Sequence, residues 1–210
     1  MEALESLKRY EGQLNEKSTN IIYPVVLSVP EEKRALSGRE SVRFLSQYAR
    51  EAVFVSAQRC GCRLAELKKD SEGAPIPSNG IFWSLSHKPE YVAGVISNHP
   101  VGIDIEEIRP VQTSLVNRIM NSDEQQETGA LSDEMFFRCW TAKESVLKAV
   151  GAGLKGLSQC RIHHIIDKTT LVVSCHQKHW LIEHVYYDNY VASVVRSEKN
   201  VQWGLPVSHI

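Results

Sequence analysis

Two segments of nearly the same sequence, far apart in the chain, constrain the fold more than any other feature. Residues 91–97 read YVAGVIS and residues 190–196 read YVASVVR. Short runs of Val, Ala and Ile also recur by chance. However, each segment follows a predicted helix and earlier strands, and each lies near the end of one half of the 210-residue chain. The shared order of elements favours a duplication, and we predict two similar α+β halves that meet near residue 105.

The first half of the chain carries clear signals for one helix and several strands. Residues 41–57 repeat apolar side chains at helical spacing, and residues 70–80 are dense in turn-forming residues, which predicts a loop. The predicted strands are residues 21–27, 81–85, 91–97 and 101–106. Pro24 indicates an edge or a bulge in the first of these strands.

The second half begins with helices and ends with strands. Ser122 and Gln125, three residues apart, resemble a capping box that opens a short helix. Ser132 or Asp133 can cap the next helix, which we expect to end near Gly151. The strands that follow are predicted to form an antiparallel meander over residues 161–166, 170–174, 179–187 and 190–196.

The charge of the chain is nearly balanced, with 24 Lys and Arg against 25 Asp and Glu and a formal net charge of −1. The charge of the whole molecule therefore does not favour a nucleic-acid or membrane-surface partner. The first nine residues are charged and lack the apolar core of a signal peptide. No apolar run approaches the roughly 18 residues of a membrane span, and we expect a cytoplasmic protein.

The cysteines are five in number and include no CxxC pair. They are Cys60, Cys62, Cys139, Cys160 and Cys175. Because the chain shows no export signal, we expect all five to be reduced thiols. The spacing of Cys60 and Cys62 is unusual for a zinc site, so we interpret them as thiols near a helix end.

An acidic pair follows the first repeated segment. In residues 101–106, VGIDIE, Asp104 and Glu106 are two residues apart, so a strand would place both on one face and Ile103 and Ile105 on the other. A solvated strand edge is one interpretation. The other is a divalent cation between the carboxylates, because hard oxygen ligands suit Mg²⁺.

The long second-half helix carries a further acid and a base at helical spacing. Glu144 and Lys148 are four residues apart and share a face, which also fits an ordinary surface pair. They flank the apolar face that contains Trp140, so we expect them at the rim of a packed region. Earlier in the chain, Ser86 and His87 follow the predicted strand 81–85 in a turn, where a hydroxyl and an imidazole can meet an anion.

Together these segments resemble the surfactin-type class of 4'-phosphopantetheinyl transferases, whose chains have two halves. The resemblance rests on residues 84–87 (SLSH), 101–106 (VGIDIE), 140–148 (WTAKESVLK) and 151–154 (GAGL), and it covers roughly residues 73–154. It implies an α+β fold of two pseudo-symmetric halves, residues 1–105 and 106–210. Each half is expected to be a small, mostly antiparallel sheet packed with helices, with the active site in the cleft between them.

The resemblance implies transfer of the phosphopantetheine arm of coenzyme A to a serine of an apo acyl- or peptidyl-carrier protein, with release of adenosine 3',5'-bisphosphate. Asp104, Glu106 and Glu144 would bind Mg²⁺, with Mn²⁺ as an alternative, against the pyrophosphate. Lys148 would contact the pyrophosphate and donate a proton to the leaving phosphate. Glu144 would act as general base for the carrier serine, directly or through water.

The resemblance also implies a set of coenzyme-binding residues. These are Ser86, His87, Lys143, Lys148 and Arg50, with Arg43 as a rival to Arg50 for the 3'-phosphate. Two positions depart from the family pattern: Ala74 replaces a lysine in a turn near the adenine, and Lys88 stands where a small residue is common. Glu124 fits either a further acidic site residue or a carboxylate at a helix N-terminus.

The implied partners are coenzyme A and a carrier protein, and residues 113–131 are the candidate docking region. We expect a monomer, because one chain supplies both walls of the cleft. A non-catalytic homologue that binds coenzyme A or carrier protein is the alternative, but a decayed site should have lost an acid or a lysine. A magnesium-dependent nucleotide phosphohydrolase is a third hypothesis, which the Trp-x-x-Lys-Glu-x-x-x-Lys pattern disfavours.

Overall fold

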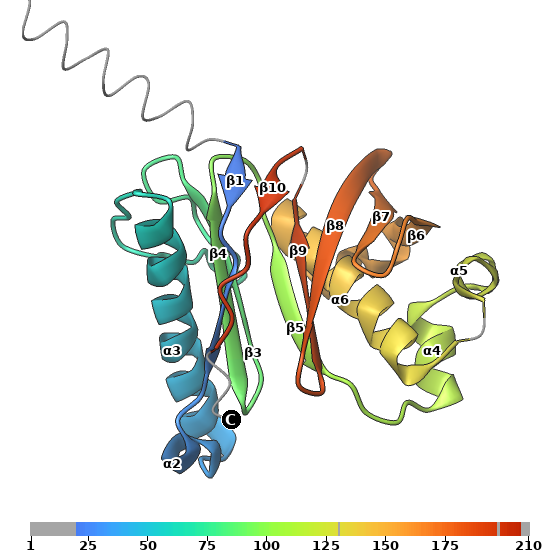
Figure 1. Ribbon diagram of the computed structural model, residues 1–210, viewed down its shortest axis with the longest axis horizontal. Helices are drawn as coiled ribbons and strands as arrows, with labels where there is room; N and C mark the ends of the chain where they lie inside the picture. The colour runs from blue at the N-terminus through green and yellow to red at the C-terminus, as the bar shows by residue number, and fades with distance from the viewer. Residues whose placement is uncertain (1–19, 130, 197, 207–210) are drawn as a thin grey trace, which may run out of the picture.

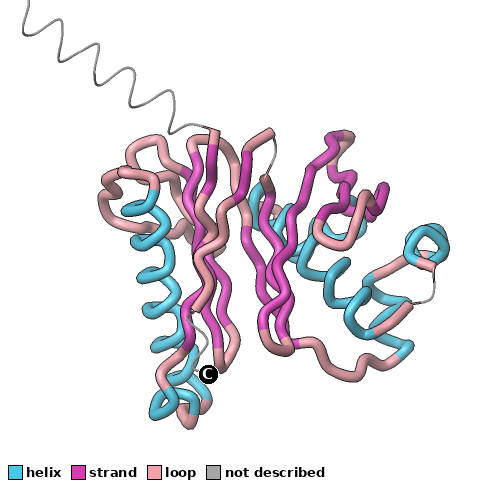
Figure 2. The backbone as a smooth tube through the Cα atoms, viewed as in Figure 1, coloured by secondary structure: helices cyan, strands magenta, loops and turns pink. Residues whose placement is uncertain are grey.

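The computed structural model describes residues 20–129, 131–196 and 198–206, so the charged N-terminal segment discussed above lies outside the described residues. Two sheets stand side by side at the centre of the molecule, with helices on their outer sides (Figures 1 and 2). Within the described ranges, no helix is long and apolar enough to cross a membrane.

The first sheet belongs to the N-terminal half. It contains β2 (Val25–Ser28), β3 (Phe82–His87) and β4 (Tyr91–Ser97), in the antiparallel order β2–β4–β3. The short helix α2 (Glu31–Arg34) leads to the long helix α3 (Gly38–Arg59), which covers the outer face of this sheet (Figure 1). Its buried stripe, which includes Leu45, Ala49 and Ala52, packs against Val25 and Val92.

The second sheet has five antiparallel strands in the order β5–β9–β8–β7–β6. The strands are β5 (Ile103–Glu107), β6 (Cys160–Ile165), β7 (Thr170–Cys175), β8 (Lys178–Tyr187) and β9 (Tyr190–Val195). The helices are α4 (Thr113–Ile119), α5 (Ser122–Thr128), α6 (Asp133–Val150) and the 3-10 helix η1 (Leu154–Gln159). The predicted meander is present, and α6 packs against β9 and β5.

The two repeated segments are the central strands of the two halves. Strands β4 and β9 are buried along their whole length, with α3 against β4 and α6 against β9. Gly94 lets α3 approach closely, since a Cβ there would lie 2.5 Å from Val53 N. The matching residue Ser193 instead shares a hydrogen bond with Thr141 of α6, with 2.5 Å between their oxygens. The prediction of two pseudo-symmetric α+β halves is confirmed.

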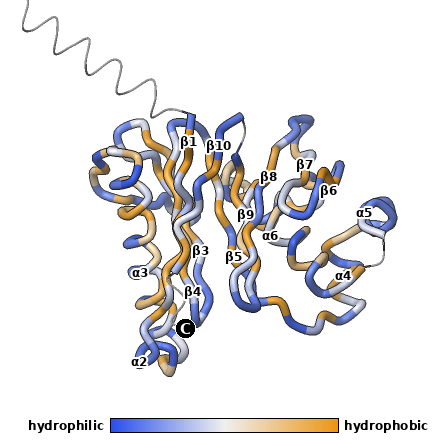
Figure 3. The backbone as a smooth tube through the Cα atoms, viewed as in Figure 1, coloured by the Kyte–Doolittle hydropathy of each residue, from blue (hydrophilic) through white to orange (hydrophobic). Residues whose placement is uncertain are grey.

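The two halves share one hydrophobic core. A single cluster of buried side chains contains Tyr91 and Val95 from β4, Ile103 and Ile105 from β5, and residues of β9. Figure 3 shows apolar residues concentrated along these strands. The Tyr91 hydroxyl also donates a hydrogen bond to the carboxylate of Asp188, in the turn between β8 and β9. The face between the sheets is therefore packed from both sides, which holds the two halves in one arrangement.

The C-terminal segment returns to the N-terminal half. Strand β10 (Asn200–Val201) pairs in parallel with β1 (Ile21–Ile22), and Val26 N donates to Gly204 O at 2.7 Å. Pro24 divides the predicted strand 21–27 into β1 and β2, because proline cannot continue the ladder of hydrogen bonds. The change from one sheet to the other falls between β4 and β5, a few residues before the predicted division at residue 105.

The helix caps show one wrong prediction and one correct one. The capping box of α5 is formed by Asn121 and Glu124, one residue before the predicted pair Ser122 and Gln125. Asn121 has the extended backbone of an N-cap, and its side chain accepts a hydrogen bond from Glu124 N at 2.9 Å. Ser132 caps α6 as predicted, and Gly151 ends that helix in the left-handed conformation.

The prediction that all cysteines are reduced is wrong for one pair. Cys160 on β6 and Cys175 on β7 form a disulfide. The two residues lie directly opposite each other in the antiparallel register, and both are buried. Their separation of 15 residues gives no local signal for the pair, because strand pairing brings the two sulfur atoms together. Cys139 is a buried free cysteine.

Candidate active site

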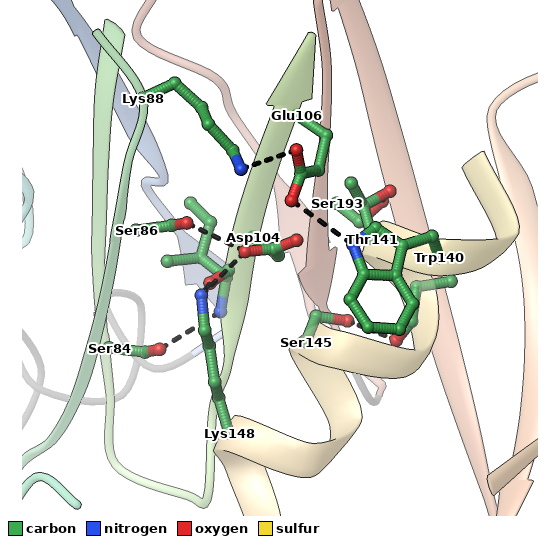
Figure 4. Close-up of polar contacts among 12 residues, drawn as sticks. Ser84, Ser86, Lys88, Asp104, Glu106, Trp140, Thr141, Ser145, Lys148 and Ser193 are labelled. Carbon is green, nitrogen blue, oxygen red and sulfur yellow. Dashed lines mark hydrogen bonds and ion pairs between the residues drawn. The ribbon is translucent and has the colours of Figure 1, made fainter. Parts of the chain in front are cut away.

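Side chains of β3 and β5 meet where the two sheets face each other (Figure 4). Every second residue from Ser84 of β3 to Lys88, the residue after β3, contacts β5, because alternate side chains of an extended chain point the same way. Three contacts join the strands: Ser84 Oγ with Ile103 N at 3.2 Å, Ser86 Oγ with Asp104 Oδ1 at 2.7 Å, and Lys88 Nζ with Glu106 Oε2 at 2.6 Å. Since Ile103 and Ile105 lie in the shared core, Asp104 and Glu106 face the other way, as predicted.

Helix α6 completes this cluster from the C-terminal half. Lys148 Nζ donates hydrogen bonds to Asp104 Oδ1 at 2.7 Å and to Ile103 O at 3.0 Å. Eight residues earlier on the same helix, Trp140 Nε1 donates a hydrogen bond to Glu106 Oε1 at 3.2 Å. Gly102 permits this close approach of helix and strand, because a Cβ there would lie 1.8 Å from the backbone oxygen of Ser145.

Glu144 lies on the same face of α6, four residues from both Trp140 and Lys148. Burial and the nearby charge of Asp104 raise the pKa of Glu144 to about 7, against the opposing effect of Lys148. Burial and Asp104 also raise the pKa of Glu106, while Lys88 opposes that shift. The three carboxylates thus form one anionic centre, in which the charge of Asp104 disfavours the ionisation of Glu106 and Glu144.

Two oxygens of this anionic centre are buried and have no hydrogen-bond partner. They are Asp104 Oδ2 and Glu144 Oε1. Orphaned carboxylate oxygens are suitable ligands for a divalent cation such as Mg²⁺. Glu106 differs, because Lys88 and Trp140 engage one of its oxygens each. Asp104 and Glu144 therefore fit a cation as they stand, whereas within the described ranges no three acidic, histidine or cysteine side chains converge on one point.

Basic groups of the N-terminal half surround the same region. Arg50 on α3 donates a hydrogen bond to Ser46 O at 2.8 Å. Desolvation lowers the pKa of Lys69, and the charges of Arg50 and Lys148 lower it further. Burial and the charge of Lys148 lower the pKa of His87, so its imidazole is neutral near pH 7. In the part of the chain that the structure describes, neither Arg50 nor Lys69 makes an ion pair. Unneutralised cations gathered in this way favour an anionic ligand.

Lys69 is a candidate residue that sequence reasoning missed. It forms an isolated bridge with Pro75 across the 70–80 loop, so it lies beside the turn in which Ala74 replaces the family's lysine. The only signal in the sequence was the adjacent pair Lys68 and Lys69, which reads as an ordinary solvated charge run. Arg43, the rival to Arg50, is exposed on α3.

A cavity of about 540 Å³ opens beside these groups, between the turn at residues 72–75 and the C-terminal end of α6. Glu144 and Lys148 line it on one side, Ala74 and Pro75 on the other, and Lys155 of η1 at its edge. A larger cavity of about 790 Å³, lined by residues such as His99 and Trp180, contains none of the predicted site residues. The smaller cavity is therefore the candidate active site.

Lys143 and Glu124 lie away from this cavity and contact each other. Lys143 Nζ is 2.6 Å from Glu124 Oε1 and donates to Ile119 O at 2.7 Å, and both side chains are almost fully buried. Glu124 also caps α5 and accepts a hydrogen bond from Ile162 N at 2.6 Å. These contacts assign Glu124 to the helix N-terminus, and they give Lys143 a partner other than the expected phosphates.

Comparisons with known proteins relate the second half of the chain to one enzyme family. Residues 100–195 match the model of the 4'-phosphopantetheinyl transferase superfamily. Three similar proteins are the 4'-phosphopantetheinyl transferases gsp of Aneurinibacillus migulanus (36% identical), psf-1 of Bacillus pumilus (38%) and HetI of Nostoc sp. strain PCC 7120 (33%). The aligned segments cover 41%, 40% and 44% of this chain, and 38%, 37% and 44% of the relatives' own lengths. The chain thus matches less than half of each relative.

Proposed function

We propose that this chain, whose residues 100–195 match the model of the 4'-phosphopantetheinyl transferase superfamily, transfers the 4'-phosphopantetheine arm of coenzyme A to a serine of an apo acyl- or peptidyl-carrier protein. Adenosine 3',5'-bisphosphate is the second product. One observation carries the proposal: Asp104, Glu106 and Lys148 meet at the junction of the two halves, beside a cavity that Glu144 also lines.

The phosphates of coenzyme A bind to the basic groups that surround this cavity. Arg50 and Lys69 belong to the N-terminal half, and Lys148 belongs to α6. The charges of Arg50 and Lys148 both lower the pKa of Lys69, which supports a common phosphate site for the three. Neutral His87 supplies a directed hydrogen bond rather than charge. A contact between Ser86 and a phosphate would require the single hydroxyl proton of Ser86 to leave Asp104 Oδ1. Lys143 is not assigned to the phosphates, because its ammonium is buried against Glu124.

Asp104, Glu106 and Glu144 are the residues that hold Mg²⁺, or Mn²⁺ in its place. The orphaned oxygens of Asp104 and Glu144 support this assignment. When bound, the cation neutralises charge that develops on the pyrophosphate as the leaving group departs. Ser86 keeps Asp104 in position through the hydrogen bond to its Oδ1, which leaves Oδ2 available.

Glu144 and Lys148 carry out the two proton transfers of the reaction. The carrier serine Oγ forms a bond to the phosphorus that bears the pantetheine arm, and the bond from that phosphorus to the bridging oxygen breaks. Glu144, directly or through water, takes the serine proton. Its pKa of about 7 is that of the carboxyl without a cation, and a bound cation would lower that pKa. Lys148 lies within reach of the same centre and donates a proton to the departing bisphosphate.

The carrier protein docks at residues 113–131, on α4, α5 and the segment after them. Leu115 is 40% exposed and Arg118 is also exposed, so this region offers both an apolar and a basic contact. Such a surface suits a carrier that is acidic around its target serine. A single chain supplies both walls of the cavity, so the active species is a monomer, and we expect it in the cytoplasm.

A panel of unrelated apo carrier proteins tests the proposal. Each carrier is incubated with the full-length chain, coenzyme A and Mg²⁺, and its intact mass is measured. The expected result is a gain of one phosphopantetheine on at least one carrier. Unchanged masses for every fatty-acid, polyketide and peptide-synthetase carrier in the panel would refute the proposed activity.

A further inference from the structure

Lys88 occupies an unusual place in the candidate active site. Lys88 directly follows β3, and its ammonium lies 2.6 Å from Glu106 Oε2, next to the β3 side chains that face β5 (Figure 4). The Glu106 side chain is only 12% exposed and that of Lys88 is 31% exposed. An ion pair that is largely shielded from water is stronger than one on an open surface. Glu106 is therefore already neutralised by a cation that the chain itself supplies.

The other two carboxylates of the centre are not engaged in the same way. Asp104 Oδ2 and Glu144 Oε1 are buried without a hydrogen-bond partner, although Lys148 contacts the other oxygen of Asp104. Glu106 has no such free oxygen, because Trp140 Nε1 takes Oε1 and Lys88 takes Oε2. A divalent cation that uses all three carboxylates must compete with the ammonium of Lys88 for the negative charge of Glu106.

We propose that Lys88 is an internal competitor for the divalent cation: it holds Glu106 while the site is empty and lowers the affinity of the chain for metal in the absence of coenzyme. This rests on the cation site of the proposed function. An ammonium and a divalent cation within a few ångströms of one carboxylate repel each other, so each weakens the binding of the other. The phosphates of coenzyme A offer the displaced ammonium a new partner, which couples metal binding to coenzyme binding.

The competition predicts a specific effect on binding of Mn²⁺, measured by electron paramagnetic resonance with the metal alone. Lys88→Met should bind Mn²⁺ about tenfold more tightly than the unaltered chain, as removal of one adjacent positive charge implies. Lys88→Gln provides a second variant with a polar side chain, and Lys88→Arg keeps the competing charge and should bind as weakly as the unaltered chain. Thermal unfolding of each variant establishes that it is folded.

Lys168→Met is the matched control. Lys168 is an exposed lysine in the turn between β6 and β7 and does not line the cavity, so its substitution removes the same charge and should leave Mn²⁺ affinity unchanged. Adding coenzyme A should tighten Mn²⁺ binding to the unaltered chain more than to Lys88→Met.

Unchanged or weaker Mn²⁺ binding by both Lys88→Met and Lys88→Gln overturns the inference, as does the absence of Mn²⁺ binding to any form. Because the direct measurement contains neither coenzyme nor carrier, its result is independent of transfer. If the Lys88 variants bind Mn²⁺ more tightly but no carrier protein is modified, the result supports the competition by Lys88 and refutes the proposed transferase activity.

Discussion

The ammonium of Lys148, on α6, lies 2.7 Å from Asp104 Oδ1, on β5. This contact joins the helix of the C-terminal half to the first strand after the junction, and Ser86 of the N-terminal half donates to the same oxygen. Three elements far apart in the sequence therefore converge on one carboxylate. Because the acid, the base and the hydroxyl come from both halves, we expect neither half to form the site alone.

Asp104→Asn should abolish transfer while leaving the fold intact. The substitution keeps the shape of the side chain but removes the charge that faces Lys148 and the proposed cation. Loss of such preorganised charge typically costs about 100- to 1,000-fold in kcat. The measurement is the initial rate of carrier modification. Glu107→Gln is the control, since Glu107 is an exposed carboxylate on the same strand. Retention of full activity by Asp104→Asn would refute the role of Asp104.

Metal affinity should depend on pH through Glu144. The pKa of this carboxyl is raised to about 7, so below that pH a proton occupies the group that would bind the cation. Apparent affinity for Mn²⁺ should rise with pH by up to roughly tenfold per unit below about 7 and level off above it. Titration calorimetry at several pH values measures this dependence. Glu144→Gln should bind more weakly and lose the slope near 7, and an unchanged slope in that variant would contradict the assignment.

Lys69→Met should weaken binding of coenzyme A without altering the fold. Lys69 has no ion-pair partner among the described residues and shares its surroundings with Arg50 and Lys148. Losing one such contact to a phosphate should raise the dissociation constant about fivefold, with a smaller effect at high salt. Lys68→Met is the matched control, because Lys68 is exposed and pairs with Glu66. Equal effects of the two substitutions would show that Lys69 has no special role.

Lys143→Met should act on stability and not on the binding of coenzyme A. Removing one partner of a buried ion pair leaves an uncompensated charge, which typically costs about 3–5 kcal/mol. Here the remaining charge is that of Glu124, which is 3% exposed. Urea unfolding should show that loss, and the double variant Lys143→Met with Glu124→Gln should recover part of it. A folded Lys143→Met protein with a large increase in the KM for coenzyme A would instead favour a phosphate contact.

Gly102→Ala should disrupt the packing of β5 on α6. An added Cβ would meet Ser145 O at 1.8 Å and Ala149 N at 2.8 Å, and both are backbone atoms that cannot rotate away. We expect the free energy of unfolding to fall by about 3 kcal/mol or more, and Lys148 to lose its contact with Asp104. Denaturant unfolding measures the first effect. A variant as stable as the unaltered chain would contradict this close approach.

Much of the fold could be predicted because local pattern and tertiary environment agree. The strand alternation around Asp104 and Glu106 placed both carboxylates on one face, and the repeat at residues 91–97 and 190–196 indicated two similar halves. The features that were missed depend on contacts between distant segments. Neither the return of residues 200–204 to β1 and β2 nor the Cys160–Cys175 disulfide has a signal in the nearby sequence.

Only part of the site could be predicted, again because some of its contacts join distant segments of the chain. Helical spacing put Glu144 and Lys148 on one face, but it could not say which way Lys143 points, because the buried partner Glu124 comes from another helix. The sequence showed Lys88 only as a departure from the family pattern, and its pairing with Glu106 depends on how the end of β3 lies beside β5. The role of Lys69 depends on how a loop folds back, which turn residues alone do not specify.

The most direct test of the central claim measures both products of one reaction at the same time. The chain, coenzyme A and Mg²⁺ are incubated with and without an apo carrier protein, and holo-carrier and adenosine 3',5'-bisphosphate are quantified together. The account predicts equal amounts of the two products with the carrier, attachment at its serine, and no bisphosphate without it. Release of bisphosphate in the absence of carrier, or a carrier that remains unmodified, would contradict it.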